Sequence, residues 1–126
     1  MREKWEEVYT KEQLNKIQEL EMYSLREIIR VCEILKISFF LYGGSLLGAV
    51  KYNGFIPWDD DLDIAMIRSD YMKFVQLAPN ILTSAYFLQS PYTDSRTPYY
   101  YKKLRLKGTK YIEYGNHRLN IEQGIY

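Results

Sequence analysis

Four aspartates within five residues are the first feature of this sequence that could do chemistry. They are Asp59, Asp60, Asp61 and Asp63, and Leu62 separates the last two. Carboxylates this close together repel one another unless a cation or a proton neutralises them. Alternate residues of a strand share a face, so a strand here would place Asp61 and Asp63 together, with Asp59 joining them if the strand extends back. Such a group suits Mg²⁺, which takes a few carboxylates plus water and phosphate oxygens, so we predict a site for Mg²⁺ or Mn²⁺.

A calcium loop and a solvated acidic turn are the alternative interpretations of these aspartates. A calcium loop starting at Asp59 requires glycine at its sixth position, where this chain has Ile64. A solvated turn conflicts with the apolar residues that bracket the acids, namely Ile56, Pro57, Trp58, Leu62 and Ile64. Buried carboxylates need a partner, and this favours the metal site.

A glycine pair and a serine, Gly43, Gly44 and Ser45, form the second candidate motif. The apolar and aromatic residues 38–42 before it predict a buried strand, and residues 45–50 predict a short helix after it. Glycine lets the backbone approach a ligand closely, and the first-turn amides of a helix bind anions. The Ser45 hydroxyl adds a donor at the same place. These residues therefore predict a phosphate site.

The net charge of +1 conceals a strongly basic late segment. Residues 96–118 hold seven basic residues and one acid, for +6, while the rest of the chain sums to −5. An acidic middle and a basic late segment suit an anionic substrate held between them, although a solvated basic hairpin has the same composition. Lys102, Lys103, Arg105 and Trp58 are the candidate contacts to a donor or an acceptor.

Composition predicts a small soluble domain rather than a particular chemistry. The chain has 126 residues, of which 47% are hydrophobic and 26% charged, and this excludes a disordered tail or a uniformly basic nucleic-acid binder. One cysteine, Cys32, and one histidine, His117, exclude an internal disulfide and a cluster of histidine ligands. No apolar run reaches the ~20 residues of a membrane span, and the first residues do not form a secretory signal. We expect a cytoplasmic protein with no nucleic-acid partner, and peripheral contact with the inner face of a membrane stays open.

The elements that must position these motifs follow from periodicity and punctuation. Thr10 and Gln13 form a capping box before an apolar stripe that predicts a helix over 11–36, with Cys32 on the stripe and Glu27 on the solvated face. Strands are expected at 62–66 and 86–89, a helix capped by Ser69 ending near 79, and a hairpin of 99–106 with 110–114. Together they predict one mixed α/β domain over 1–126, with a leading helix (10–37), a central core carrying both motifs (38–78) and later strands with the basic segment (85–126).

The two motifs in their context resemble the LicD family of the nucleotidyltransferase-fold superfamily. The resemblance is carried by YGGSLLGAV at 42–50, GFIPWDDDLDI at 54–64, and RSDY at 68–71 followed by Phe74. It implies a nucleotidyltransferase-like fold with a mixed sheet, Gly44 and Ser45 at a donor phosphate, and Asp61 and Asp63 as the catalytic metal pair with Asp59 as a helper. The family moves a phospho-alcohol such as phosphocholine from a CDP-linked donor to a sugar hydroxyl of a surface glycan, for example lipopolysaccharide or teichoic acid.

One part of the family pattern has no counterpart here. It is a third carboxylate on a later strand, shortly after a glycine such as Gly124; Glu113 and Glu122 do not match it, and the chain ends at Tyr126. We therefore expect the N-terminal portion of a longer enzyme, weakly active or inactive alone. Two alternatives stay open: a nucleotidyltransferase that attaches a nucleoside monophosphate to an acceptor, and a non-catalytic module that binds a metal or a nucleotide.

Overall fold

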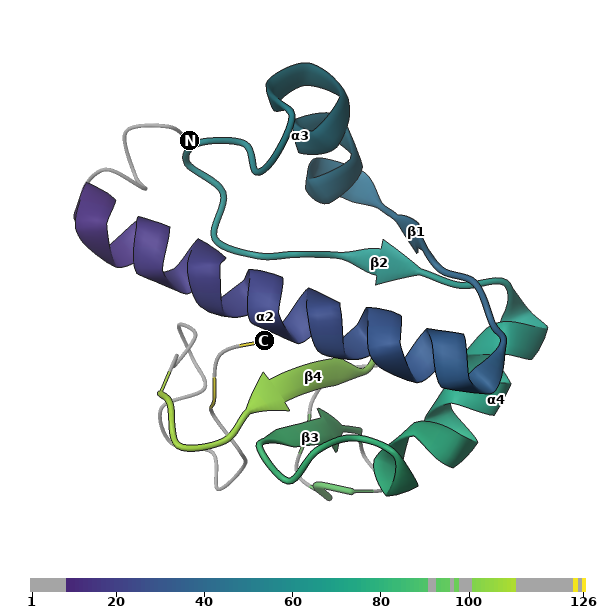
Figure 1. The fold of residues 1–126 in the computed structure, drawn as a ribbon. Helices are drawn as coiled ribbons and strands as arrows, with labels where there is room; N and C mark the ends of the chain where they lie inside the picture. The colour runs from purple at the N-terminus through teal and green to yellow at the C-terminus, as the bar shows by residue number, and fades with distance from the viewer. Residues whose placement is uncertain (1–8, 91–92, 96, 98–100, 111–123, 125) are drawn as a thin grey trace.

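The computed structural model describes residues 9–90, 93–95, 97, 101–110, 124 and 126. Their order along the chain (Figure 1) is α2 (Lys11–Leu35), β1 (Phe40–Leu41), α3 (Gly43–Tyr52), β2 (Ile64–Ala65), α4 (Arg68–Leu77), the 3₁₀ helix η1 (Ala78–Asn80), β3 (Tyr86–Gln89) and β4 (Lys103–Leu106). Helices and two small antiparallel strand pairs make this an α+β arrangement, consistent with the predicted mixed α/β class. None of the helices within these ranges is long and apolar enough to cross a membrane.

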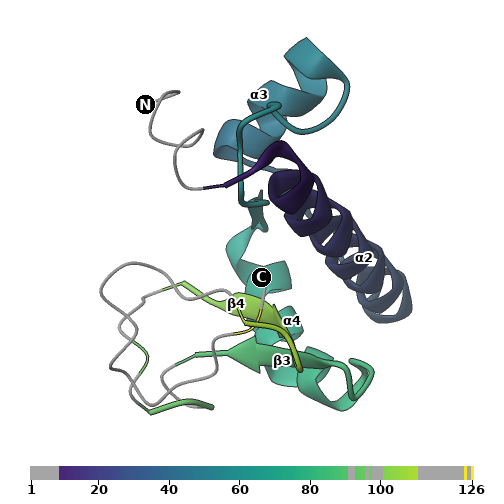
Figure 2. The same ribbon diagram turned by 90° about the vertical axis from the view of Figure 1, so that its left-hand side faces the viewer.

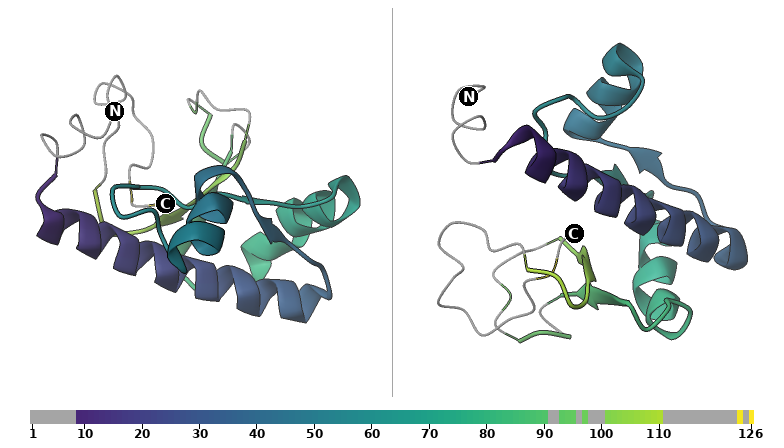
Figure 3. Two further views of the ribbon diagram at one scale, coloured as in Figure 1. Left: turned by 90° about the horizontal axis from the view of Figure 1, so that it is seen from above. Right: turned by 60° about the vertical axis from the view of Figure 1, so that its left-hand side comes forward.

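The long helix α2 is the element against which the rest of the described chain packs. α3 and the pair β1–β2 lie on one side of it, and β3 and β4 lie on the other (Figures 1 and 3). Its predicted capping box is confirmed. The backbone N–H of Gln13 donates to Thr10 Oγ1 at 3.1 Å, and the backbone N–H of Thr10 donates to Gln13 Oε1 at 2.9 Å. The helix ends at Lys36, whose φ of 56° is left-handed and lets its N–H bond back to Cys32 and Glu33 carbonyls.

The prediction of a solvated face on α2 was wrong for Glu27. Its side chain is buried, with 7% exposed for the whole residue. One carboxylate oxygen accepts from Arg30 Nε at 2.6 Å and the other from Thr83 N at 2.9 Å. The glutamate is buried because the turn before β3 folds over this part of the helix and supplies a donor.

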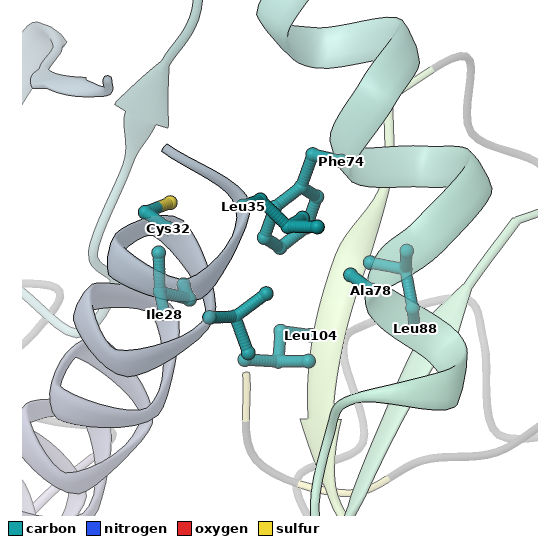
Figure 4. Close-up of a cluster of buried hydrophobic side chains, with 8 residues drawn as sticks. Ile28, Cys32, Leu35, Phe74, Ala78, Leu88 and Leu104 are labelled. Carbon is teal, nitrogen blue, oxygen red and sulfur yellow. The ribbon is translucent and has the colours of Figure 1, made fainter. Parts of the chain in front are cut away.

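The hydrophobic core joins α2 to the second half of the chain. Figure 4 shows the apolar stripe of α2 facing Phe74 of α4, Leu88 of β3 and Leu104 of β4. Cys32 is 3% exposed and packs within this cluster, as predicted for a small core residue. The core therefore sets the position of α4 and of the strand pair β3–β4 relative to α2.

The strand pair β1–β2 is shorter than predicted. Pairing is antiparallel and limited to Phe40 with Ala65 and Leu41 with Ile64, instead of the expected strands 38–42 and 62–66. Phe40 is 52% exposed, so β1 is not the buried strand that its aromatic composition suggested. A ribbon of two strands leaves one face open to solvent, and this accounts for the exposed phenylalanine.

β4 pairs with β3 in antiparallel register, Tyr86 opposite Leu106 through Gln89 opposite Lys103. The expected hairpin partner of this strand, residues 110–114, lies outside the described residues from 111 on, so that hairpin stays a prediction. The prediction that Ser69 caps α4 was wrong, because the helix already begins at Arg68 and its N-cap residue is the extended Ile67. Figure 2 shows α3 at the opposite end of the molecule from β3 and β4.

Candidate functional site

The pairing of β1 with β2 brings the glycine-serine motif and the aspartate loop side by side. Tyr42 N donates to Asp63 O at 3.1 Å, and Asp63 N donates to Ser45 Oγ at 2.8 Å. Ser45 is 8% exposed. The serine predicted to bind phosphate therefore also holds the backbone of the aspartate loop against the start of α3.

The first turn of α3 lies directly against Asp59. Gly43 begins the helix with a φ of 59°, which favours glycine. A Cβ on Gly44 would lie 2.9 Å from Asp59 Oδ2, so only glycine leaves room for this carboxylate at its present position. The positive end of the helix dipole and its unpaired amides face the same place. This end of α3 is therefore suited to anions, and in this structure the anion against it is the carboxylate of Asp59.

Two further contacts fix the loop that carries the aspartates. A Cβ on Gly48 would lie 2.4 Å from the Gly54 carbonyl oxygen and 2.8 Å from Ile56 N, so α3 and the following turn pack backbone to backbone. From α2, Gln18 Nε2 donates to Asp59 O at 2.8 Å. The loop is therefore held by both helices before it reaches β2.

Asp59, Asp60 and Asp61 are the aspartates that the structure groups most closely. Each can offer one carboxylate oxygen such that the three oxygens lie within 4.8 Å of one another. Asp60, which the sequence analysis did not select, is 7% exposed and accepts from Tyr9 Oη at 3.3 Å. Burial raises the pKa of the Asp59 carboxyl above its usual range. A cluster of this kind is the oxygen-rich donor set that Mg²⁺ or Mn²⁺ takes.

Asp63 does not belong to this close group. The expectation that Asp61 and Asp63 share the face of a strand was wrong, because neither residue belongs to a strand. Both precede β2 and lie in the loop. Burial raises the pKa of the Asp63 carboxyl, the charge of Asp61 adds to the rise, and the Lys103 ammonium opposes it. Asp63 therefore lies close enough to Asp61 of the cluster and to Lys103 of β4 for both charges to affect its pKa.

Glu21 of α2 is the site residue that sequence reasoning missed. It is 2% exposed, and within the described residues its Oε2 has no hydrogen-bond partner. Burial raises the pKa of its carboxyl to about 10, and the charges of the four aspartates add to the rise. The available signal was its position, because Glu21 follows Ile17 by four residues and precedes Ile28 by seven on the buried stripe of α2.

A cavity of about 800 Å³ lies between β2 and β4, with α2 and α4 contributing to its wall. Its acidic lining residues are Glu21, Asp61 and Asp63. Its basic lining residues are Arg68, Lys102 and Lys103. The tyrosines Tyr42, Tyr71, Tyr101 and Tyr126 add aromatic surface. One cavity thus combines groups that attract a cation with groups that attract phosphates.

The predicted substrate contacts divide between this cavity and the rest of the molecule. Lys102 lies with its Nζ 5.9 Å from the Tyr71 ring centre, and Lys103 is 4% exposed with its Nζ 3.8 Å from the Tyr126 ring centre. Arg105 is fully buried, donates to Gln89 Oε1 at 2.9 Å and to Gly124 O at 2.7 Å, and does not line the cavity. The described lining also leaves out Trp58, whose ring packs edge-on against Tyr52 at 6.0 Å. His117, Glu113 and Glu122 lie outside the described residues.

The donor set fits a divalent cation on its own chemistry. Three carboxylates converge within 4.8 Å, and a fourth, Glu21, has a buried oxygen that lacks a partner within the described residues. Carboxylate oxygens are what Mg²⁺ and Mn²⁺ prefer, and a bound cation would relieve the repulsion within the cluster. A group of carboxylates beside a helix N-terminus, with two lysines lining the neighbouring cavity, thus combines groups that attract a cation with groups that attract phosphates.

Comparison with known proteins gives the family. Residues 36–120, well over half of the chain, match the family LicD/FKTN/FKRP, nucleotidyltransferase domain. The chain belongs to this family. No solved structure matches it, so the nucleotidyltransferase-like fold expected from the resemblance stays a prediction.

Two relatives show how much of the chain is similar to longer proteins. Over 47 residues, 37% of this chain, it is 53% identical to the lipopolysaccharide cholinephosphotransferase LicD of Haemophilus influenzae, of which the match covers 18%. Over 52 residues, 41% of this chain, it is 38% identical to the ribitol 5-phosphate transferase FKRP of Homo sapiens, of which the match covers 10%. The matched segment is thus a small part of each relative's length.

Proposed function

We propose that this domain serves a metal-dependent transferase that moves a phospho-alcohol, such as phosphocholine or a pentitol phosphate, from a CDP-linked donor to a sugar hydroxyl of a cell-surface glycan. The single observation that carries the proposal is the cavity that Asp61 and Asp63 line together with Lys102 and Lys103. Membership of the LicD/FKTN/FKRP family and the names of the two relatives support the reaction class.

The reaction asks the protein for positioning and charge neutralisation rather than for a nucleophilic side chain. In such a transfer the bond between the two donor phosphates breaks, the alcohol-bearing phosphate joins the sugar oxygen, CMP leaves, and the hydroxyl proton passes to solvent. A divalent cation held by Asp59, Asp60, Asp61 and Asp63 would neutralise phosphate charge. Lys102 and Lys103 would attract the same phosphates from the opposite wall.

The other motif residues hold this arrangement together. Ser45 fixes the backbone of Asp63, and Gly44 leaves room for the Asp59 carboxylate. Once Asp59 binds the cation, the first-turn N–H groups of α3 could donate hydrogen bonds to a phosphate of the CDP-linked substrate. Tyr71 and Tyr101 supply aromatic surface in the cavity for the nonpolar parts of a donor.

Calorimetric titration of the chain with Mn²⁺ or Mg²⁺, and then with CDP-choline, tests the proposal. We expect cation-dependent nucleotide binding in the wild type and an affinity loss of at least about tenfold in Asp61→Asn/Asp63→Asn. The melting temperature of this variant should not fall, because removing two like charges relieves repulsion. A matched control is Glu19→Gln/Glu33→Gln, which removes two exposed charges of α2.

The outcomes separate the alternatives. Unchanged binding in the aspartate variant contradicts the proposed metal site, and loss of the fold favours a non-catalytic, structural role for the acids. Product analysis with longer chains that contain this domain distinguishes the two enzymes. Release of CMP from CDP-choline supports phospho-alcohol transfer, whereas release of pyrophosphate from a nucleoside triphosphate supports nucleotidyl transfer.

A further inference from the structure

Glu21 occupies a buried position on α2 where an apolar side chain would make folding more favourable. The residue lies on the buried stripe of the helix, with Ile17 one turn before it and Ser24 one turn after it, and is 2% exposed. Burying a carboxyl group is costly unless its oxygens are bonded, and buried polar atoms without a partner are uncommon in proteins. Within the described residues, Glu21 Oε2 is one of few such atoms. We therefore expect Glu21 Oε2 to bind a hydrogen-bond donor or a cation.

Glu27 shows what a structural buried glutamate looks like on the same helix. It lies six residues further along α2 and is 7% exposed. Both of its oxygens are bonded, one to Arg30 and one to Thr83. The fold of this chain can therefore satisfy a buried glutamate from within, and it does not do so for Glu21 Oε2.

The groups around Glu21 indicate what the partner is. Asp61 and Asp63 line the same cavity as Glu21, and the basic residues of that cavity are Arg68, Lys102 and Lys103. The ion pairs found in the described part of the chain are Lys16 with Glu19 and Arg30 with Glu27, so neither includes Glu21. A small divalent cation takes several oxygen ligands, so it can contact Glu21 and the aspartates together.

We infer that Glu21 is a further carboxylate of the cation site, supplied by α2 to a site otherwise formed by the aspartate loop. The inference rests on the proposed function, since it assumes that Asp59–Asp63 bind a divalent cation. Glu21 contacts the cation directly or through a cation-bound water. Because α2 carries the core stripe as well, the cation then joins the loop to the helix on which the fold is built. Cation binding should therefore stabilise the whole domain as well as the loop.

Glu21→Gln tests this assignment without changing side-chain size. A role as a neutral buried spacer predicts no effect, because glutamine has the shape of a protonated glutamate. A role in the cation site predicts that Mn²⁺ affinity, measured by calorimetry, falls by at least about tenfold. It also predicts that the rise in melting temperature on adding Mn²⁺ becomes smaller, while the melting temperature without a cation does not decrease. Glu21→Asp keeps the charge and should retain part of the affinity.

Glu27→Gln is the matched control. It should lower the melting temperature but leave Mn²⁺ affinity within about twofold of wild type, because Glu27 bonds to Arg30 and Thr83. Exposed Glu19→Gln is a second control if Glu27→Gln does not fold. Wild-type affinity in Glu21→Gln overturns the inference. If Asp61→Asn/Asp63→Asn loses binding in that case, the proposed function stands without Glu21. If the wild type binds no divalent cation, both fail.

Discussion

At the scale of single residues, the site depends on where a side chain is absent. Gly44 leaves the space that the Asp59 carboxylate fills, and Gly48 leaves the space for the backbone of residues 54–56. The identity of these glycines follows from what packs against them rather than from turn geometry, since neither has a positive φ. The backbone of Asp59 is held at both ends, because its N–H donates to Ile56 O at 2.9 Å and its carbonyl accepts from Gln18 Nε2 at 2.8 Å. The geometry of the acidic cluster therefore depends on close contact between α3 and the loop.

Gly44→Ala tests this contact. The added methyl group would lie 2.9 Å from Asp59 Oδ2, so the carboxylate must move away from the cluster. We expect Mn²⁺ affinity to fall by about tenfold. Stability should change by no more than about 1 kcal/mol, because alanine also favours the helix. Calorimetric titration and urea unfolding provide the two measurements. Gly54→Ala is the control, because no atom lies within 4 Å of its Cβ position; an equal affinity loss in both variants contradicts the explanation.

At the scale of elements, α2 serves both the core and the site. One part of its buried face packs against α4, β3 and β4, and Glu21 and Gln18 face the aspartate loop. The Glu27–Arg30 pair and the Thr83 bond attach the helix to the turn before β3. α2 also lines the cavity through Glu21, Ser24, Leu25 and Ile28, so its position helps to set the shape of the cavity.

Glu27 predicts a pH dependence of stability. The hydrogen bond from Arg30 holds the pKa of the Glu27 carboxyl below its usual value of 4.5 in the folded state. Its stabilising contribution is therefore complete above the unfolded pKa and is lost as the pH falls through the folded pKa. Glu27→Gln can accept only one of the two bonds and should cost about 1 kcal/mol at pH 7. In urea unfolding from pH 7 to pH 3, the stability difference between wild type and variant should narrow below about pH 4.5; a constant difference contradicts this role.

At the scale of the whole molecule, the cavity lies between two strand pairs that are not joined to each other within the described residues. β1–β2 and β3–β4 are separate two-stranded sheets, and α2 and α4 hold them on either side of the cavity. Phe74 belongs to both the core and the cavity wall. Ile28, Leu88 and Leu104 also belong to both, so packing in the core and the shape of the site are coupled through these side chains.

Phe74→Ala should show this coupling. Phe74 is 6% exposed, and removing a buried phenyl ring costs about 3–5 kcal/mol. Urea unfolding should show this loss, and the variant should bind CDP-choline with Mn²⁺ more weakly even where it remains folded. Met72→Ala on the exposed face of the same helix is the control and should change stability by less than about 0.5 kcal/mol. A similar effect of both changes would mean that Phe74 does not anchor α4.

What the sequence by itself determined is the local part of the description. The capping box of Thr10 and Gln13, the core stripe of α2 and the β3 strand depend on neighbouring residues and on periodicity, and they match the structure. The acidic and glycine-serine motifs were also evident, because their residue types are unusual at that spacing. Local patterns are predictable because their energies come from residues within a few positions.

Only the tertiary structure decided which side chains meet. Asp60 joins the acidic cluster, Arg105 is buried away from the cavity, and Glu21 reaches the site from an element forty residues earlier. Helical or strand periodicity could not show this, because α2 buries both Glu21 and Glu27 and only the packing of other elements gives them different surroundings. Burial and charge act through space, so the partner of a buried carboxyl is set by the fold and not by its neighbours in the chain.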